Sequence, residues 1–183
     1  AAILSCIVLF TSTPLHAQSP AAVIEGAKKE GKLAYYTVLS LPESRALVAA
    51  FEKKYPFVKV ELFRLEGDKM RSKILTEARA GRHTFDVTSN SITNIGLLMR
   101  DGMLGTYQSQ ARERIWPGLK DRSGYWSGIY VRLYVITYNT DLVPKKEAPK
   151  DWWDLLDPKW NGKIGLDEEI ELYGALALHW GKE

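Results

Sequence analysis

The sequence of 183 residues contains one cysteine, Cys6, which excludes a disulfide framework, a cysteine-only zinc site and a CxxC redox motif. It also lacks the G-x-S-x-G, H-E-x-x-H and phosphate-binding glycine motifs of common enzymes. The net charge is small, because 25 Lys and Arg residues against 22 Asp and Glu residues leave only +3. This is too little to indicate a nucleic-acid partner. With 45% hydrophobic residues, the composition is that of an ordinary folded domain.

The N-terminal segment has the order of a secretory signal. Residues 3–10 form an uncharged apolar block, and a short stretch ending at Ala17 follows. The block is shorter than the ~20 residues of a membrane-spanning helix. We therefore predict a partial signal peptide over residues 1–17, export to the periplasm and no stable insertion in the membrane. A buried apolar helix and a lipid-modified Cys6 remain as alternatives.

Helix and strand patterns alternate along the next part of the chain. The pattern predicts helices over residues 20–30, 41–55, 67–80 and 92–101, and strands over 32–38, 58–63 and 85–88. Such an alternation with short connections calls for a parallel sheet with helices on its faces. Ligands of these sheets bind beyond the carboxyl ends of the strands. The loops at residues 38–43, 64–68 and 88–94 are therefore candidate ligand-binding loops.

The second half of the chain changes character. Residues 126–138 are rich in β-branched and aromatic residues, and as one strand they would reach ~40 Å at ~3.3 Å per residue. We interpret this length as a strand that passes from one lobe to another. A helix over 151–156, a strand over 163–166 and a helix over 172–180 then follow. The predicted domains are an N-terminal α/β lobe (18–126), a hinge (127–139) and the start of an incomplete second lobe (140–183).

Two groups of residues in this half keep alternative interpretations. The acidic run at Asp167, Glu168 and Glu169 suits a cation with oxygen ligands, or else the solvated first turn of the last helix. Aromatic residues such as Tyr138 and Trp152 suit stacking on a sugar, or else a place in the core. The run also motivates a contrasting hypothesis, a secreted hydrolase with an acidic pair, although no catalytic motif supports it.

Several ordered segments carry a family resemblance. The segment 49–56 reads AAFEKKYP, and Glu77-Ala78-Arg79-Ala80-Gly81 precedes Phe85-Asp86-Val87. The most specific block runs over residues 135–165, from VITYNTDLV to APKDWWDLLDPKWNGKIG. In these segments the chain resembles the periplasmic solute-binding proteins of ABC importers (extracellular solute-binding family 1), in the branch that contains the ferric-iron-binding proteins.

The resemblance implies an α/β fold of the type II periplasmic binding protein kind, with two lobes and a hinge. It implies a monomer that is no enzyme and has no cofactor. The protein would capture a small solute, with ferric iron as one candidate, in the cleft between the lobes. It would deliver that solute to a membrane permease and its ATPase. A sugar, a polyamine or another small organic solute remains an alternative ligand.

This chain departs from the iron-binding pattern at three places. The family's histidine after the first strand corresponds to Ser40, and its glutamate after the third strand corresponds to about Ser91. The small-residue turn that holds an anion is replaced by residues 167–169. The paired tyrosine ligands of the family would lie beyond Glu183, so the metal ligands stay unknown.

The predicted site is therefore polar and largely neutral. Ser40, and Ser89 or Asn90, are expected as helix caps, as ligand contacts, or as both. The predicted ligand-binding residues are Thr37, Leu39, Ser40, Glu66, Ser89, Asn90, Ser91, Tyr138, Asp167 and Glu168, and none is predicted to be catalytic.

Overall fold

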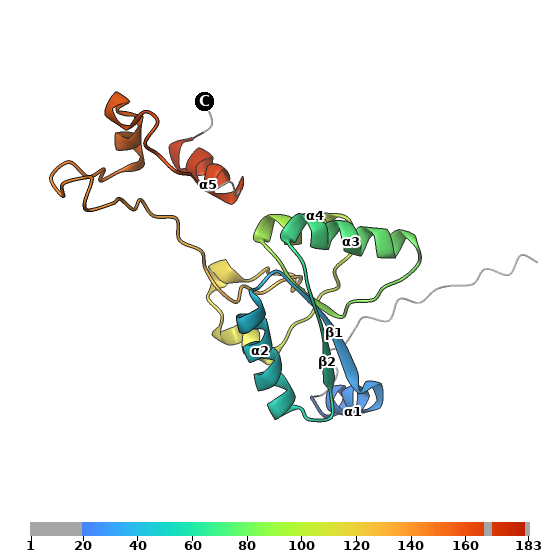
Figure 1. Ribbon diagram of the computed structural model, residues 1–183. Coiled ribbons are helices and arrows are strands. Elements are labelled where there is room, and N and C mark those ends of the chain that lie inside the picture. Colours follow the sequence, from blue (N-terminus) through green and yellow to red (C-terminus); the bar gives the residue numbers. More distant parts are fainter. Residues whose placement is uncertain (1–19, 167–169, 182–183) are drawn as a thin grey trace, which may run out of the picture. The chain divides into compact units, whose positions relative to one another are not determined.

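The computed structural model describes residues 20–166 and 170–181 (Figure 1). The chain separates into two compact units, and the boundary falls between Gly128 and Ile129. The predicted signal peptide lies outside the described residues, as do Asp167 and Glu168. Within the described ranges, every helix is too short or too polar to cross a bilayer. The predicted domain limits themselves remain a prediction.

The first unit is built on a parallel sheet with the strand order β2-β1-β3. The central strand β1 (Lys32–Thr37) pairs on one side with β2 (Lys59–Arg64) and on the other with β3 (Val87–Ser89). Both pairings are parallel, as the alternation of helix and strand predicts. The sequence-based α/β interpretation is therefore confirmed in this unit.

The described part of the first unit has four α-helices (Figure 1). α1 (Pro20–Glu30) precedes β1, α2 (Leu41–Lys54) connects β1 to β2, α3 (Gly67–Arg79) connects β2 to β3, and α4 (Ile92–Arg100) follows β3. Each lies where the apolar spacing predicts a helix. The stop after α1 is made by Gly31, whose φ of 68° is a left-handed conformation that glycine adopts at little cost.

One face of the sheet carries the core of the first unit. Tyr36 of β1 packs there with Met70 and Ile74 of α3 and with Leu98 of α4. Met70 and Leu98 have no exposed surface. Burial of such side chains contributes about 1.5–3 kcal/mol each, so this cluster holds α3 and α4 against the sheet.

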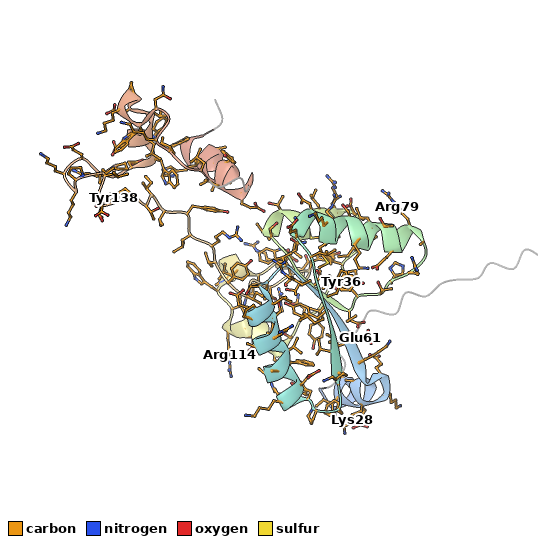
Figure 2. All side chains as sticks on the ribbon, in the orientation of Figure 1. Lys28, Tyr36, Glu61, Arg79, Arg114 and Tyr138 are labelled. Atoms are coloured by element: carbon orange, nitrogen blue, oxygen red, sulfur yellow. The ribbon has the colours of Figure 1, made fainter. Side chains whose placement is uncertain are left out.

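A polar cluster fastens α3 to the same face. Tyr36 is labelled in Figure 2. Its hydroxyl donates to Glu77 at 3.2 Å and lies 3.0 Å from the Thr84 hydroxyl. Lys73 forms an ion pair with Glu77, and its ammonium also lies 4.6 Å from the centre of the Phe63 ring. Burial raises the pKa of Glu77, but the hydrogen bonds from Lys73, Thr84 and Tyr36 outweigh it, so the pKa lies below its ordinary value.

The end of the first unit is a compact stretch of short turns. It contains the 3-10 helices η1 (Gln110–Arg114) and η2 (Pro117–Leu119) and one antiparallel bridge between Lys120 and Ser127. Arg112 is buried within it.

The second unit contains the 3-10 helices η3 (Trp152–Leu156) and η4 (Pro158–Trp160) and the helix α5 (Ile170–Trp180). The predicted helix over 172–180 is confirmed, and the one over 151–156 forms as a 3-10 helix. The predicted strands over 126–138 and 163–166 are wrong for this structure, since residues 129–166 contain no strand. A strand needs a neighbour for its N–H and C=O groups, and beyond the bridge at Ser127 no described segment forms a ladder with these residues.

Candidate functional site

The carboxyl ends of β1 and β3 form the candidate site of the first unit. The chain leaves β1 toward β2 on one side and later returns to β3 on the other, so the connections run in opposite directions from the centre of the sheet. Open α/β sheets bind ligands in the crevice at such a reversal. The loops that follow β1 and β3 are two of the three predicted from the sequence.

Three hydroxyl groups join the ends of these two strands. The Thr37 hydroxyl lies 2.7 Å from that of Ser89, which lies 2.8 Å from that of Tyr35. The backbone N–H of Leu39 donates to the Thr37 hydroxyl at 3.1 Å. Thr37 is fully buried, so its hydroxyl braces the two strands instead of facing solvent. The structure thus brings together three predicted site residues, Thr37, Leu39 and Ser89.

Ser40 begins α2 with the predicted capping box. The Glu43 N–H donates to the Ser40 hydroxyl at 3.5 Å, and the Ser40 N–H donates to the Glu43 carboxylate at 3.1 Å. The Ser40 hydroxyl also donates to this carboxylate, which holds the pKa of Glu43 below its ordinary value. Beside them, Arg64 Nε donates to the Leu39 carbonyl at 3.1 Å. Arg64 begins one of the three predicted loops, but its contact with Leu39 could not be predicted, because only the fold places the end of β2 beside the loop after β1.

Ser91 caps α4, accepting from the Asn94 N–H at 3.4 Å. The cap predicted at Ser89 or Asn90 is therefore wrong by one or two residues. The reason is that β3 extends to Ser89, whose hydroxyl is engaged by the sheet. Whether Ser40 and Ser91 also contact a solute stays a prediction.

The start of α3 lies against the start of α4. Asn90 Nδ2 donates to the Gly67 carbonyl at 3.0 Å, and Asn94 Nδ2 donates to the Asp68 carboxylate at 3.1 Å. A Cβ atom on Gly67 would lie 2.8 Å from Asn90 Oδ1 and 2.9 Å from Asn94 Nδ2, so a larger residue there would displace both side-chain amides. Asn94 and Asp68 end two of the predicted loops but are not among the individually predicted ligand-binding residues. The available signal was the position of Asn94, three residues after Ser91 in the first turn of a helix.

Glu66 is the remaining predicted site residue of the first unit. It is exposed at the start of α3 and forms an ion pair with Lys69 at 2.6 Å, which lowers the pKa of its carboxyl group. Over residues 20–166 and 170–181, no three His, Cys, Asp or Glu side chains gather as a metal-binding group. The first unit therefore offers mainly hydroxyl, amide and backbone groups at its strand ends.

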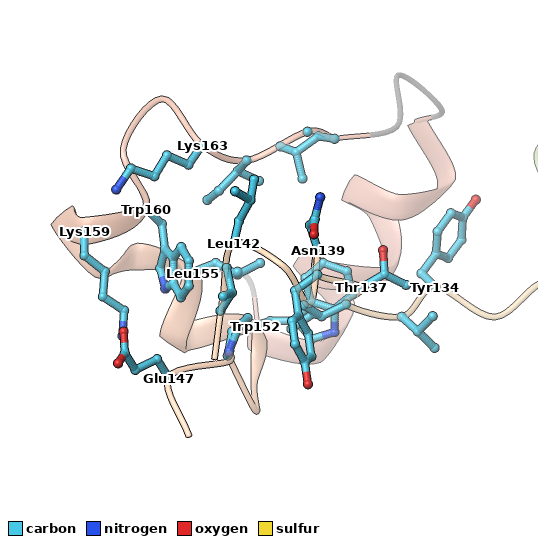
Figure 3. A pocket seen from close by; sticks show the side chains of 18 of the residues that line it. Tyr134, Thr137, Asn139, Leu142, Glu147, Trp152, Leu155, Lys159, Trp160 and Lys163 are labelled. Carbon is cyan, nitrogen blue, oxygen red and sulfur yellow. The ribbon is translucent and has the colours of Figure 1, made fainter. Parts of the chain in front are cut away.

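Tyr138 belongs to the second unit. It lines a hollow of about 920 Å³ together with Trp152, Leu155 and Trp160 (Figure 3). Most of the lining is apolar, and the few polar side chains include Asn139 and Lys163. This composition is closer to an open core surface than to a polar solute site.

Comparison with known proteins gives the following likenesses. The profile of the family described as bacterial extracellular solute-binding protein matches residues 87–183. Iron-bound HitA from Pseudomonas aeruginosa is 23% identical with a TM-score of 0.58, over 70% of this chain and 42% of that one. A Trichodesmium protein (IdiA, FutA) in complex with iron and citrate ligands is 27% identical with a TM-score of 0.66, over 81% of this chain and 48% of that one. Among curated proteins, none matches.

The chain thus spans less than half the length of these two proteins. The structural likenesses confirm the predicted α/β fold of the type II periplasmic binding proteins.

Proposed function

Because this chain belongs to the bacterial extracellular solute-binding proteins, we propose that its full-length protein is the solute-capturing component of an ABC importer. The family match over residues 87–183 is the observation that carries the proposal. The family is one of binding proteins, so the alternative of a secreted hydrolase finds no support in it. Location in the periplasm, a monomeric state and delivery to a permease and its ATPase belong to the same proposal.

The proposed solute is ferric iron, because both structural neighbours are described with iron bound. Fe³⁺ prefers hard oxygen ligands. The strand ends of the first unit provide Ser40 and about Ser91 where the family resemblance implies the His and Glu of the iron-binding branch, so this unit supplies hydrogen bonds instead of strong metal ligands. The coordinating oxygens must then come from the rest of the full-length protein and from a chelating anion. Citrate is the anion that accompanies iron in the Trichodesmium protein.

Titration of the purified, iron-free full-length protein with ferric citrate tests this proposal. We expect one iron per protein, seen as a new visible absorption band and as iron retained after gel filtration. Ser40 and Ser91 are not proposed to coordinate the metal ion. Ser40→Ala and Ser91→Ala are therefore expected to change the affinity for iron by less than about tenfold, or about 1.4 kcal/mol. A protein that retains no iron, and instead retains a sugar or a polyamine, would reject iron as the solute.

Uptake in cells tests the transport part separately. We expect a strain without the gene to take up less radioactive iron from ferric citrate, and the restored gene to return uptake to its original rate. Unchanged uptake, in a strain with no second iron importer, would contradict the assignment to an importer of iron.

A further inference from the structure

Arg112 is a buried cation near the end of the first unit. Only 7% of its surface is exposed, and it lies in the 3-10 helix η1. Its Nε donates to the Gln108 side chain at 3.0 Å, and its Nη1 donates to the Trp126 carbonyl at 2.7 Å and to the Ser127 hydroxyl at 2.5 Å. Nη2 donates to the Asp121 carbonyl.

All four of these acceptors are neutral, so the described contacts of Arg112 are those of a cross-link and not of an ion pair. A guanidinium carries five N–H donors in a rigid planar fork, which suits it to hold several acceptors at once. Here the fork joins η1 to two later parts of the same stretch, at Asp121 and at Trp126–Ser127. From the other side, Lys120 Nζ donates to the Arg112 carbonyl at 2.6 Å.

The segment that Arg112 holds leads directly to the boundary between the units. The Asp121 N–H donates to the Trp126 carbonyl at 3.1 Å, and the Gly128 N–H donates to the Leu119 carbonyl at 2.7 Å. The boundary falls at the next peptide, and residues 129–139 contain neither helix nor strand. The cross-linked structure therefore stops where the irregular segment begins.

We propose that Arg112 is a positioning residue that fixes the point at which the chain leaves the first unit, and so sets the pivot for movement of the second. The inference rests on the proposed function in one respect, since it takes the protein to open and close as a binding protein does. Domain movements are absorbed by a few backbone torsions next to rigid anchors. An anchor that ends at Gly128 concentrates these torsions just beyond that residue.

Arg114 provides a matched control. It lies in the same short helix, carries the same charge and is exposed, and Figure 2 shows it at the surface of the first unit. Arg112→Gln removes the fork, whereas Arg114→Gln removes a charge without a cross-link. Ser127→Ala is a milder variant, which deletes one acceptor and keeps the arginine.

The experiment measures the distance between spin labels on the two units of the full-length protein, with no solute added. The labels are attached to cysteines that replace Lys53 in α2 and Lys146 in the second unit, both of which are exposed. We expect Arg112→Gln to increase the width of the distance distribution at least twofold. Ser127→Ala should increase it less, and Arg114→Gln should leave it unchanged.

Hydrogen exchange on the same proteins shows separately whether the local structure of residues 119–128 has loosened. An unchanged width in Arg112→Gln would overturn the proposal, whether or not the amides of residues 119–128 exchange faster. Equal broadening in Arg114→Gln would also overturn it. If Arg112→Gln does not fold, the width in Ser127→Ala decides in the same way. Because no solute is used, failure of iron binding would reject the proposed function and leave this test intact.

Discussion

The two units of this chain differ in how far their apolar side chains are buried. In the first unit, Met70, Ile74 and Leu98 are at most 1% exposed. In the second unit, Leu133, Leu142 and Leu178 are 78% to 81% exposed. Side chains exposed to that extent contribute little free energy of burial to the second unit.

Helix-capping side chains form their hydrogen bonds in both units. Ser40 and Glu43 form a capping box at the start of α2, and Asp151 and Asp154 form one at the start of η3. The units differ in strand pairing, since the first unit supplies partners for β1 on both sides, and described residues 129–166 supply none. The contrast teaches that caps and turns are properties of a segment, whereas a strand is a property of a pair.

The largest expected effect comes from the same substitution made in each unit. In the 183-residue chain, Leu98→Ala should lower the free energy of unfolding by about 2–5 kcal/mol, because it opens a cavity in a closed core. Leu142→Ala should change it by less than about 0.5 kcal/mol, because that side chain is mostly in solvent. Urea denaturation followed by circular dichroism measures both. Equal losses would remove the contrast between the units.

Ion pairs offer a second comparison. The Glu77 side chain is 13% exposed and bonds Lys73, Thr84 and Tyr36, whereas the pair of Asp157 with Lys159 at 3.7 Å is about half exposed. Glu77→Gln should cost about 1–3 kcal/mol at pH 7. Asp157→Asn should cost about 0–0.5 kcal/mol.

The pH dependence of the Glu77 contribution follows from the direction of its pKa. The pKa in the folded state lies below the ordinary value of 4.5, so the contribution is present above that pH and is lost as the pH falls below it. Unfolding measured from pH 7 to pH 3 should show a steeper loss in the wild type than in Glu77→Gln. Parallel curves for the two proteins would contradict the assignment.

Glycine substitutions give a third and smaller effect, with opposite signs in the two units. Gly67→Ala should lower the free energy of unfolding by about 1 kcal/mol. Displacing Asn90 and Asn94 by the new Cβ atom costs more than the better helix propensity of alanine gains. Gly174→Ala, in the middle of α5 with open space around it, should raise helix stability by about 0.5–1 kcal/mol. Thermal unfolding measures both, and a gain in Gly67→Ala would show that the two asparagines move aside freely.

The smallest contrast is between the two capping boxes. Ser40→Ala should cost about 1 kcal/mol, because α2 is a full helix in which the Glu43 N–H loses its acceptor. Asp151→Ala should cost only a few tenths of a kcal/mol, because η3 is one short turn of which most is solvated. Denaturation of both variants checks the ratio. Comparable losses would mean that η3 supports more structure than its length indicates.

The sequence predicts features that depend on one segment better than features that depend on the pairing of two segments. The capping box at Ser40, the helix stops and the β-α-β order of the first unit depend on residues close together in the chain, and these were predictable, whereas the cap of α4 was placed one or two residues too early. The strand over 126–138 was not, because its propensity is real but its partner is a matter of tertiary structure. Within the site, Ser40 was predictable as a cap. The engagement of Ser89 by Thr37 and Tyr35 was not, because it depends on the pairing of β1 with β3.

Arg112 is the clearest case of a residue without a sequence signal. It stands in a polar stretch between Gln108 and Asp121, where an arginine is ordinarily a surface residue. Only the turns on either side make it a buried donor of four hydrogen bonds.

The strand order of the first unit has a consequence for the timing of folding. β1 is first in the chain and central in the sheet, and its partners begin at Lys59 and Val87. A ribosome has therefore made all three strands that the structure describes in this sheet by the time Ser89 is complete. Closing the longer of the two loops costs only about 0.6 kcal/mol more than closing the shorter. These three strands can thus pair as a foldon while the remainder of the chain is still being synthesised.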